Sequence, residues 1–234
     1  MSAAAPFPNP GPDSGPIPYA ELCVTSNFTF LTGASHPEEL VTRAAELGLS
    51  ALAITDRNSV AGVVRAFSAL KELTRLRAEA EAQARTAAQD APAIRSQRQD
   101  DPSSRQIRQP APPGATISAP LPRLIAGARL VLTDSAVDWL ALPTDLAAWS
   151  RLTRLLSLGK RRATKGECHL QRADLLDWGQ GMLLIPLPPD PREDSAPPTS
   201  RADLLTLARA FPGQCFLGAA PRYDGRDQAR LDQL

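Results

Sequence analysis

Three polar side chains alternate along the first strand that the sequence predicts, and their types could bind a metal ion. Glu21, Cys23 and Thr25 lie at every second position of the run from residue 19 to residue 25. Side chains of a strand point alternately to its two faces, so these three share one face. Polar groups that converge from strand ends build the metal and phosphate sites of α/β barrels. The row therefore lies where such a site is expected, although its ligand types are wrong for a strong metal site.

A second candidate site is the basic string that contains Lys160, Arg161, Arg162 and Lys165. It is the only concentrated group of cations in the sequence. A solvated loop is one interpretation, and contact with the phosphates of DNA is the other. No aromatic residues are interleaved with the cations, which weakens the case for stacking of single-stranded bases. The residues of the string leave both interpretations open.

The sequence contains two histidines, which excludes a histidine-rich metal centre. His36 precedes a predicted helix and is interpreted as a residue of its capping region. His169 stands beside Cys168, and adjacent side chains of an extended segment point apart, so we do not expect them to share a metal ion. Cys23, Cys168 and Cys215 form no CxxC pair, and this scattered set indicates buried thiols in a reducing compartment, not a disulfide framework.

Hydrophobic periodicity and capping signals predict alternating strands and helices. Ser35 is expected to cap a helix that ends at Gly48, and Phe28, Phe30 and Leu31 before it are expected to fill a core. The elements expected after that helix are strands over residues 49–55, 124–132, 182–187 and 214–219, and helices over residues 60–76, 144–159 and 200–211. This order predicts an α/β fold with a parallel sheet and right-handed crossovers.

Composition separates an ordered core from polar, proline-rich segments. The chain has 234 residues, is 43% hydrophobic and contains 23 prolines, which cluster. Residues 1–18 are expected to form a disordered leader, residues 84–120 a flexible insertion and residues 188–199 a proline-rich loop, because such segments bury too little apolar surface to offset their ordering entropy. The formal net charge of +1 gives no general attraction to nucleic acid or membrane. No run reaches the roughly 18–20 apolar residues that a membrane helix needs.

Three blocks of the sequence resemble a known family. The blocks Tyr19–Leu40 and Ala51–Val64 are similar to the opening of bacterial C-family DNA polymerase III α-type subunits. The block Leu155–Leu170, which carries the basic string, resembles specifically the error-prone, translesion branch of that family. The shared region is the N-terminal PHP (polymerase and histidinol phosphatase) domain, which implies a partial or distorted (βα)7 barrel with parallel strands. Such a domain would extend over residues 19–234, truncated, with disordered proline-rich insertions.

The resemblance also implies that the metal-binding motif of the family is degraded in this chain. Metal-binding relatives carry histidines along the first strand, an Asp-His pair after the second and a glutamate in a later strand. The corresponding residues here are Glu21, Cys23 and Thr25, then Asp56 and Arg57, then Arg129. Arginine cannot bind a metal ion, and its charge repels one. We therefore expect Glu21 or Asp56 to pair with Arg57 or Arg129 in place of the ion, with zinc binding by Glu21, Cys23 and Asp56 as the alternative.

The function that the resemblance implies needs no catalysis by this chain. We expect the N-terminal, metal-free PHP domain of an error-prone DNA polymerase that acts in damage-induced translesion synthesis, with a scaffolding role and no catalytic residue of its own. Magnesium belongs to the full family polymerase, and neither zinc nor manganese is expected here. The expected partners are the rest of the polymerase or translesion accessory proteins. If the basic string does not contact phosphate, it would contact the rest of the polymerase.

DNA would be contacted indirectly, no membrane is involved, and a cytoplasmic location is expected. Two other functions remain as alternatives at this point. One is a stand-alone metal-dependent phosphoesterase of PHP type, and the degraded ligand set argues against it. The other is a non-enzymatic interaction remnant of a truncated gene.

Overall fold

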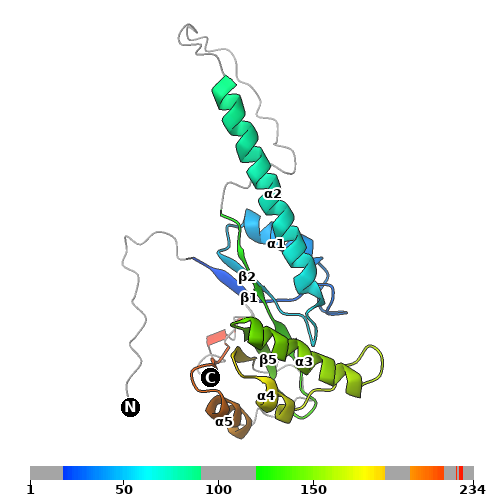
Figure 1. Ribbon diagram of the computed structural model, residues 1–234. Coiled ribbons are helices and arrows are strands. Elements are labelled where there is room, and N and C mark those ends of the chain that lie inside the picture. The colour runs from blue at the N-terminus through cyan, green and yellow to red at the C-terminus, as the bar shows by residue number, and fades with distance from the viewer. Residues whose placement is uncertain (1–17, 91–119, 188–200, 219–224, 226, 229–234) are drawn as a thin grey trace.

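The computed structural model describes residues 18–90, 120–187, 201–218, 225 and 227–228 (Figure 1). The predicted leader, apart from residue 18, and the predicted proline-rich loop at 188–199 lie outside these residues. The described strands form two three-stranded sheets. No helix of the described ranges is both long enough and apolar enough to cross a bilayer.

The first sheet is parallel, which confirms the prediction from the alternation of strands and helices. It contains, in this order, β1 (Ala20–Val24), β2 (Ala51–Ile54) and β3 (Arg123–Ala126). β2 is the central strand and all four of its residues are buried, as expected for a short apolar run between two neighbours. The polar ends of β1 and β2 therefore lie next to each other at one edge of the sheet.

Two helices cover the first sheet, α1 (Pro37–Glu46) and α2 (Ala61–Asp90). Val41 of α1 and Val63 of α2 belong to the same buried cluster as Leu52 and Ile54 of β2. Burial of such side chains contributes about 1.5–3 kcal/mol each, so this cluster accounts for the docking of both helices. The order β1, α1, β2, α2 is the crossover arrangement that the sequence predicts.

The ends of α1 show how the sequence sets its limits. The N-cap is His36, one residue later than the predicted Ser35, because the backbone N–H of His36 donates to the Glu39 carboxylate at 2.8 Å. Pro37 then occupies the first helical position, where its missing N–H costs nothing. Gly48 follows the helix with φ of +68°, the left-handed conformation that glycine adopts without strain. The helix ends at Glu46 with Leu47 as its C-cap, so the predicted cap at Gly48 is one residue too late.

α2 is much longer than predicted, and it overturns the predicted start of the insertion. Residues 84–90, assigned to the flexible segment 84–120, continue the helix to Asp90. Ion pairs along its exposed surface support the helix beyond its predicted end at residue 76, since Arg75 pairs with Glu79 at 2.5 Å and Arg77 pairs with Glu81 at 3.0 Å. Such i,i+4 pairs stabilise a helix that has little to pack against. In Figure 1 the far half of α2 projects away from both sheets. Residues 91–119 lie outside the described residues.

The second sheet is antiparallel, so the prediction of parallel strands is wrong for this half of the molecule. Its strands are, in order, β4 (Ala128–Leu130), β5 (Asp138–Pro143) and β6 (Met182–Leu187). β5 was not predicted at all. The predicted strand at 214–219 is also not formed as a strand: Cys215 makes one isolated bridge to Leu184 of β6, and residue 219 lies outside the described part.

Gly127 is the point where the chain leaves one sheet and enters the other. The sequence predicts one strand over 124–132, whereas the structure has β3 in the first sheet and β4 in the second, on either side of Gly127. A Cβ atom at this position would lie 2.6 Å from Leu142 Cδ2 and 3.1 Å from the carbonyl oxygen of Ala141. Only glycine allows the backbone to pass so close to β5.

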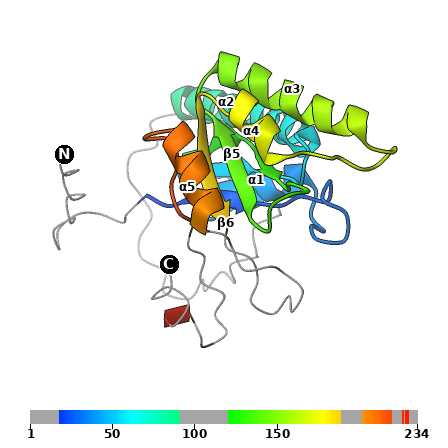
Figure 2. The same ribbon diagram turned by 90° about the horizontal axis from the view of Figure 1, so that it is seen from below.

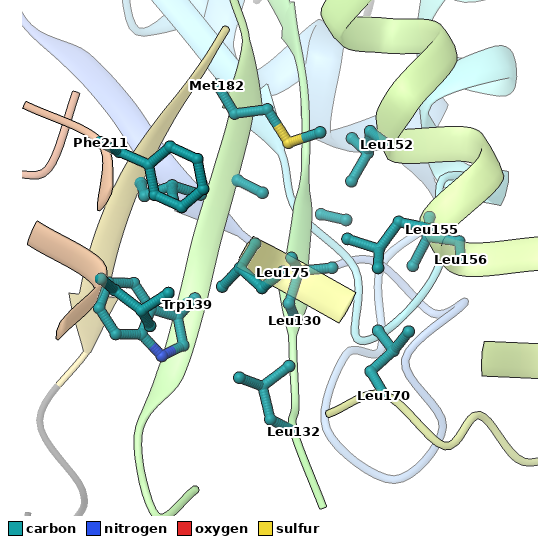
Figure 3. Close-up of a cluster of buried hydrophobic side chains, with 14 of the residues drawn as sticks. Leu130, Leu132, Trp139, Leu152, Leu155, Leu156, Leu170, Leu175, Met182 and Phe211 are labelled. Carbon is teal, nitrogen blue, oxygen red and sulfur yellow. The ribbon is translucent and has the colours of Figure 1, made fainter. Parts of the chain in front are cut away.

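The second sheet carries the larger core of the molecule (Figure 3). Helices α3 (Leu146–Arg162), α4 (Arg172–Trp178) and α5 (Arg201–Ala210) surround it, and α4 was not predicted. Leu152 and Leu155 of α3 belong to this core, as do Trp139 of β5 and Met182 of β6. All four side chains are at most 1% exposed. Leu146, predicted for the same apolar face, is instead 79% exposed at the start of the helix.

The limits of α3 differ from the prediction at both ends. Asp145 is the N-cap in place of Thr144, because its carboxylate accepts the N–H of Ala148 at 2.6 Å. The helix also continues past Gly159 to Arg162. Gly159 does not end α3; it lets the helix pack closely, since a Cβ there would lie 2.6 Å from Leu170 Cδ2. Three of the four cations of the basic string therefore lie in the last turn of a helix.

Candidate functional site

Asp56, directly after β2, is a fully buried carboxylate that holds the loop between β1 and α1. Its Oδ1 accepts the backbone N–H of Ser26 at 2.8 Å and the Thr29 hydroxyl at 2.9 Å, and its Oδ2 accepts the Ser26 hydroxyl at 2.8 Å. Gly62 leaves room for this arrangement, because a Cβ there would lie 2.3 Å from Oδ2. The expected pairing of Asp56 with an arginine is therefore wrong: its oxygens are engaged by backbone and hydroxyl donors.

Arg129, on β4, pairs with Asp138 at the start of β5. Its Nε and Nη2 atoms lie 2.7 and 2.5 Å from the same Asp138 oxygen. The partner of Arg129 is thus Asp138, whereas the sequence hypothesis named Glu21 or Asp56. Glu21 instead accepts the hydroxyl of Tyr19 at 2.9 Å.

The Cys23 thiol lies near charged groups of both sheets. It is exposed on β1, yet the protein atoms packed around its sulfur raise the pKa of the thiol. The Arg129 guanidinium opposes this rise, whereas the carboxylates of Glu21 and Asp138 add to it. Thr25 follows β1 and is half-buried. Three of the predicted positions, Glu21, Cys23 and Arg129, therefore lie in one electrostatic neighbourhood, with Asp138 as a member that the sequence did not indicate.

Replacing Arg129 by glutamine should slow the reaction of Cys23 with a thiol reagent severalfold at mildly alkaline pH. The raised pKa leaves less thiolate at any given pH, and only the thiolate reacts. Loss of Arg129 removes the larger of the two causes that lower this pKa and leaves Asp138, which raises it. Alkylation of the Cys23 peptide followed by mass spectrometry across a pH series measures the effect. Arg123→Gln, on an exposed arginine of β3, is the control; an equal slowing there contradicts the local cause.

The residues at this place do not fit a metal ion. The Asp138 carboxylate already carries a guanidinium, and the three acceptor contacts of Asp56 are taken up by the β1–α1 loop. Within the described ranges, no group of three or more histidine, cysteine, aspartate or glutamate side chains is arranged to hold a metal ion. Arg57 adds a further positive charge directly after Asp56. We therefore derive no chemistry through a metal at these residues.

A cleft of about 850 Å³ lies beside these residues and collects part of the basic string. Lys160 and Lys165 line it together with His169. Arg57, one of the degenerate metal positions, lines it from the β2–α2 loop. The cleft thus joins two sets of residues that the sequence treats as separate candidate sites.

The other two cations of the basic string do not line the cleft. Arg162 Nη1 instead pairs with the Asp174 carboxylate of α4 at 2.6 Å, which ties the end of α3 to α4. Arg161 is exposed and absent from the lining. The predicted group of four cations is therefore split by the helix that carries three of them.

Two residues that shape the cleft were not recognised as part of a site. Phe28, expected in the core, is 41% exposed and lines the cleft, and Phe30 and Leu31 of the same loop are 84% and 90% exposed. Asn58 lies in the left-handed region with φ of +47°, and its amide accepts the N–H of Val131 at 2.9 Å. The sequence signal for Asn58 was its residue type, because asparagine tolerates this conformation better than most residues.

The comparisons with known proteins agree with this architecture. Residues 21–95 match the PHP domain family. The crystal structure of a proposed metal-dependent phosphoesterase from Bifidobacterium adolescentis shares the fold, with a TM-score of 0.53 at 13% identity over 94% of this chain and 86% of that one. The described residues therefore form an α/β fold whose first part matches the PHP domain family.

The relatives make the assignment narrower. The chain is 60% identical, over 91% of its length, to an error-prone DNA polymerase of Ruegeria pomeroyi, and 39% identical, over 92%, to one of Rhodopseudomonas palustris. It spans 18% and 15% of the lengths of these two relatives. Over more than 90% of its length the chain is therefore similar to part of these error-prone DNA polymerases.

Proposed function

We propose that this chain is a metal-free PHP domain that supports the geometry of an error-prone DNA polymerase during damage-induced translesion synthesis. The observation that carries the proposal is the Arg129–Asp138 ion pair, which puts a guanidinium beside Cys23 where the family motif would put a metal ligand. This ion pair joins β4 to β5 within the second sheet, and its two charges balance each other without a free ion. In this proposal residues 19–234 form one domain whose sheets belong to a distorted (βα)7 barrel.

The proposed partners follow from the relatives, which are several times longer than this chain. The rest of the polymerase, or accessory proteins of translesion synthesis, would pack against the domain in the cytoplasm, and DNA synthesis would take place outside it. What supports a structural role is that the polar residues at the strand ends bond to one another. The Asp56 oxygens accept hydrogen bonds from the β1–α1 loop, and Asp138 pairs with Arg129.

Zinc or manganese should leave the thermal stability of the purified chain unchanged. A ligand present at about 100 times its Kd stabilises a protein by about 2.7 kcal/mol, which is about 5–11 °C in Tm for a chain of this size. Tm is measured after EDTA treatment and again with increasing Zn²⁺ or Mn²⁺. A saturable rise of several degrees overturns the metal-free proposal.

Arg129→Glu is the positive control for this titration. The substitution removes the guanidinium and adds a carboxylate beside Cys23 and Asp138, which are both possible zinc ligands. This variant should be less stable than the parent in EDTA, because like charges face each other, and should regain stability with zinc. A parent without response beside a responsive variant supports the proposal and shows that the assay detects binding.

A stand-alone phosphoesterase is the second candidate, and the observation in its favour is the fold that this chain shares with the B. adolescentis protein. At 13% identity that likeness concerns the fold alone. The test is release of p-nitrophenol from p-nitrophenyl phosphate with Mn²⁺ or Zn²⁺ present. We expect the parent chain to release p-nitrophenol no faster than the Arg129→Gln variant. A metal-dependent rate in the parent chain that differs from the rate of this variant favours the phosphoesterase.

A further inference from the structure

The cleft beside the strand ends carries an excess of positive charge. Arg57, Lys160 and Lys165 line it, and Glu167 is its only carboxylate, so the lining has a net charge of +2 with His169 neutral. None of the three cations forms an ion pair with a described carboxylate. Glu167 instead lies 3.4 Å from His169 Nε2. The cations are therefore available to an anion from solvent.

Lys160 and Arg57 come from two parts of the chain, and contacts fix the backbone at each of them. Lys160 lies in the last turn of α3, next to Gly159, whose backbone packs against Leu170. The backbone N–H of Arg57 donates to the Thr29 hydroxyl at 2.9 Å, which ties Arg57 to the Asp56 network. The β1–α1 loop and the loop after α3 lie on the same side of the molecule in both views (Figures 1 and 2). Positions fixed in this way suit a ligand with more than one negative group.

An aromatic ring completes the lining. Phe28 contributes to the cleft and remains 41% exposed. Its backbone N–H donates to the Ser26 hydroxyl at 3.2 Å, and Ser26 in turn bonds to Asp56, so the ring stands on a fixed loop. An exposed aromatic ring beside a cationic groove is the combination that binds single-stranded nucleic acid, by stacking of bases and attraction of phosphates. The volume of about 850 Å³ also suits a group of nucleotide size.

We propose that this cleft binds single-stranded DNA, with Arg57, Lys160 and Lys165 on the phosphates and Phe28 against a base. A single strand is favoured over a duplex because stacking on Phe28 requires a base that is not already stacked on both faces. The chain's net charge of +1 supplies no general attraction, so binding reports this local site. The contact is direct and lies outside the scaffolding role proposed above.

Fluorescence anisotropy with a labelled oligonucleotide of about 15 nucleotides tests the phosphate contacts. The double variant Lys160→Gln, Lys165→Gln should bind at least about tenfold more weakly. It should also lower the slope of log affinity against log salt by about 1.4, since each lost phosphate contact on a single strand removes about 0.7. The matched control is Lys71→Gln with Arg85→Gln, which removes two cations from the exposed surface of α2. Equal losses in both double variants overturn the proposal.

The aromatic contact has its own matched pair of variants. Phe28→Ala should weaken binding at least about fivefold, and Phe28→Trp should restore it, because stacking of one base contributes about 1–3 kcal/mol. Phe30→Ala, in the same loop but outside the cleft lining, should have no effect. Unlabelled single strand should compete better than a duplex of the same length or free dTTP. A preference for duplex or for dTTP, or equal losses for Phe28→Ala and Phe30→Ala, contradicts single-strand binding.

Discussion

Replacing Asp56 by alanine should lower the free energy of unfolding by about 4 kcal/mol, the largest effect that we expect from one polar side chain in this protein. The carboxylate is fully buried and accepts three hydrogen bonds from Ser26 and Thr29. Alanine leaves these donors without acceptors, and each unsatisfied buried donor costs about 1–3 kcal/mol. Urea unfolding followed by circular dichroism measures the loss.

Asp56→Asn separates the hydrogen bonds from the rest of the side chain. The amide oxygen can still accept from the Ser26 N–H and from Thr29, and the Ser26 hydroxyl can rotate to accept from the amide nitrogen. We therefore expect less than half of the loss caused by alanine. A loss of below about 1 kcal/mol for Asp56→Ala, within the range of ordinary surface substitutions and their errors, contradicts the role assigned to this carboxylate.

Leu155→Ala should lower the free energy of unfolding by about 3 kcal/mol. Leu155 is 0% exposed and lies between α3 and the second sheet, in the core drawn in Figure 3. Truncation removes buried methyl groups and leaves a cavity, and substitutions of this kind cost about 2–5 kcal/mol. The same urea titration measures this variant.

Leu146→Ala is the matched control, because it is the same substitution on the same helix. Leu146 is 79% exposed, so we expect a change within about 0.5 kcal/mol. Similar losses for the two variants are incompatible with the packing of α3 described above. The pair also tests the corrected position of Leu146, since the sequence pattern placed both leucines on one apolar face.

The first half of the fold could be predicted because local signals agree with the tertiary structure there. The buried run of β2, the glycine after α1 and the order of elements all indicate a parallel sheet. The second half could not, because β5 is a short apolar run and such a run has no periodicity that separates it from a helix. Gly127 was a usable signal, since an isolated glycine inside a strand pattern often marks a break.

The candidate site shows a similar division. Lys160 and Arg162 are close in the sequence, but on a helix they are about 200° apart, so one faces the cleft and the other reaches α4. Their separation became visible only once α3 was seen to continue past Gly159. The partner of Arg129 was missed for a different reason: Asp138 belongs to β5, which the sequence did not reveal. The sequence therefore identifies the charged residues of the site, but the ion pairs that they form can be assigned only from the fold.

The passage of the chain through Gly127 also bears on how the protein is made. β2 ends at Ile54, whereas its neighbour β3 ends at Ala126, so the first sheet lacks one strand until the intervening segment has been synthesised. At roughly 5–20 residues per second, a nascent chain waits several seconds with one edge of β2 open. An open strand edge is a template for pairing with other chains. The open edge of β2 is therefore available to other chains during this interval, until β3 and Gly127 have been synthesised.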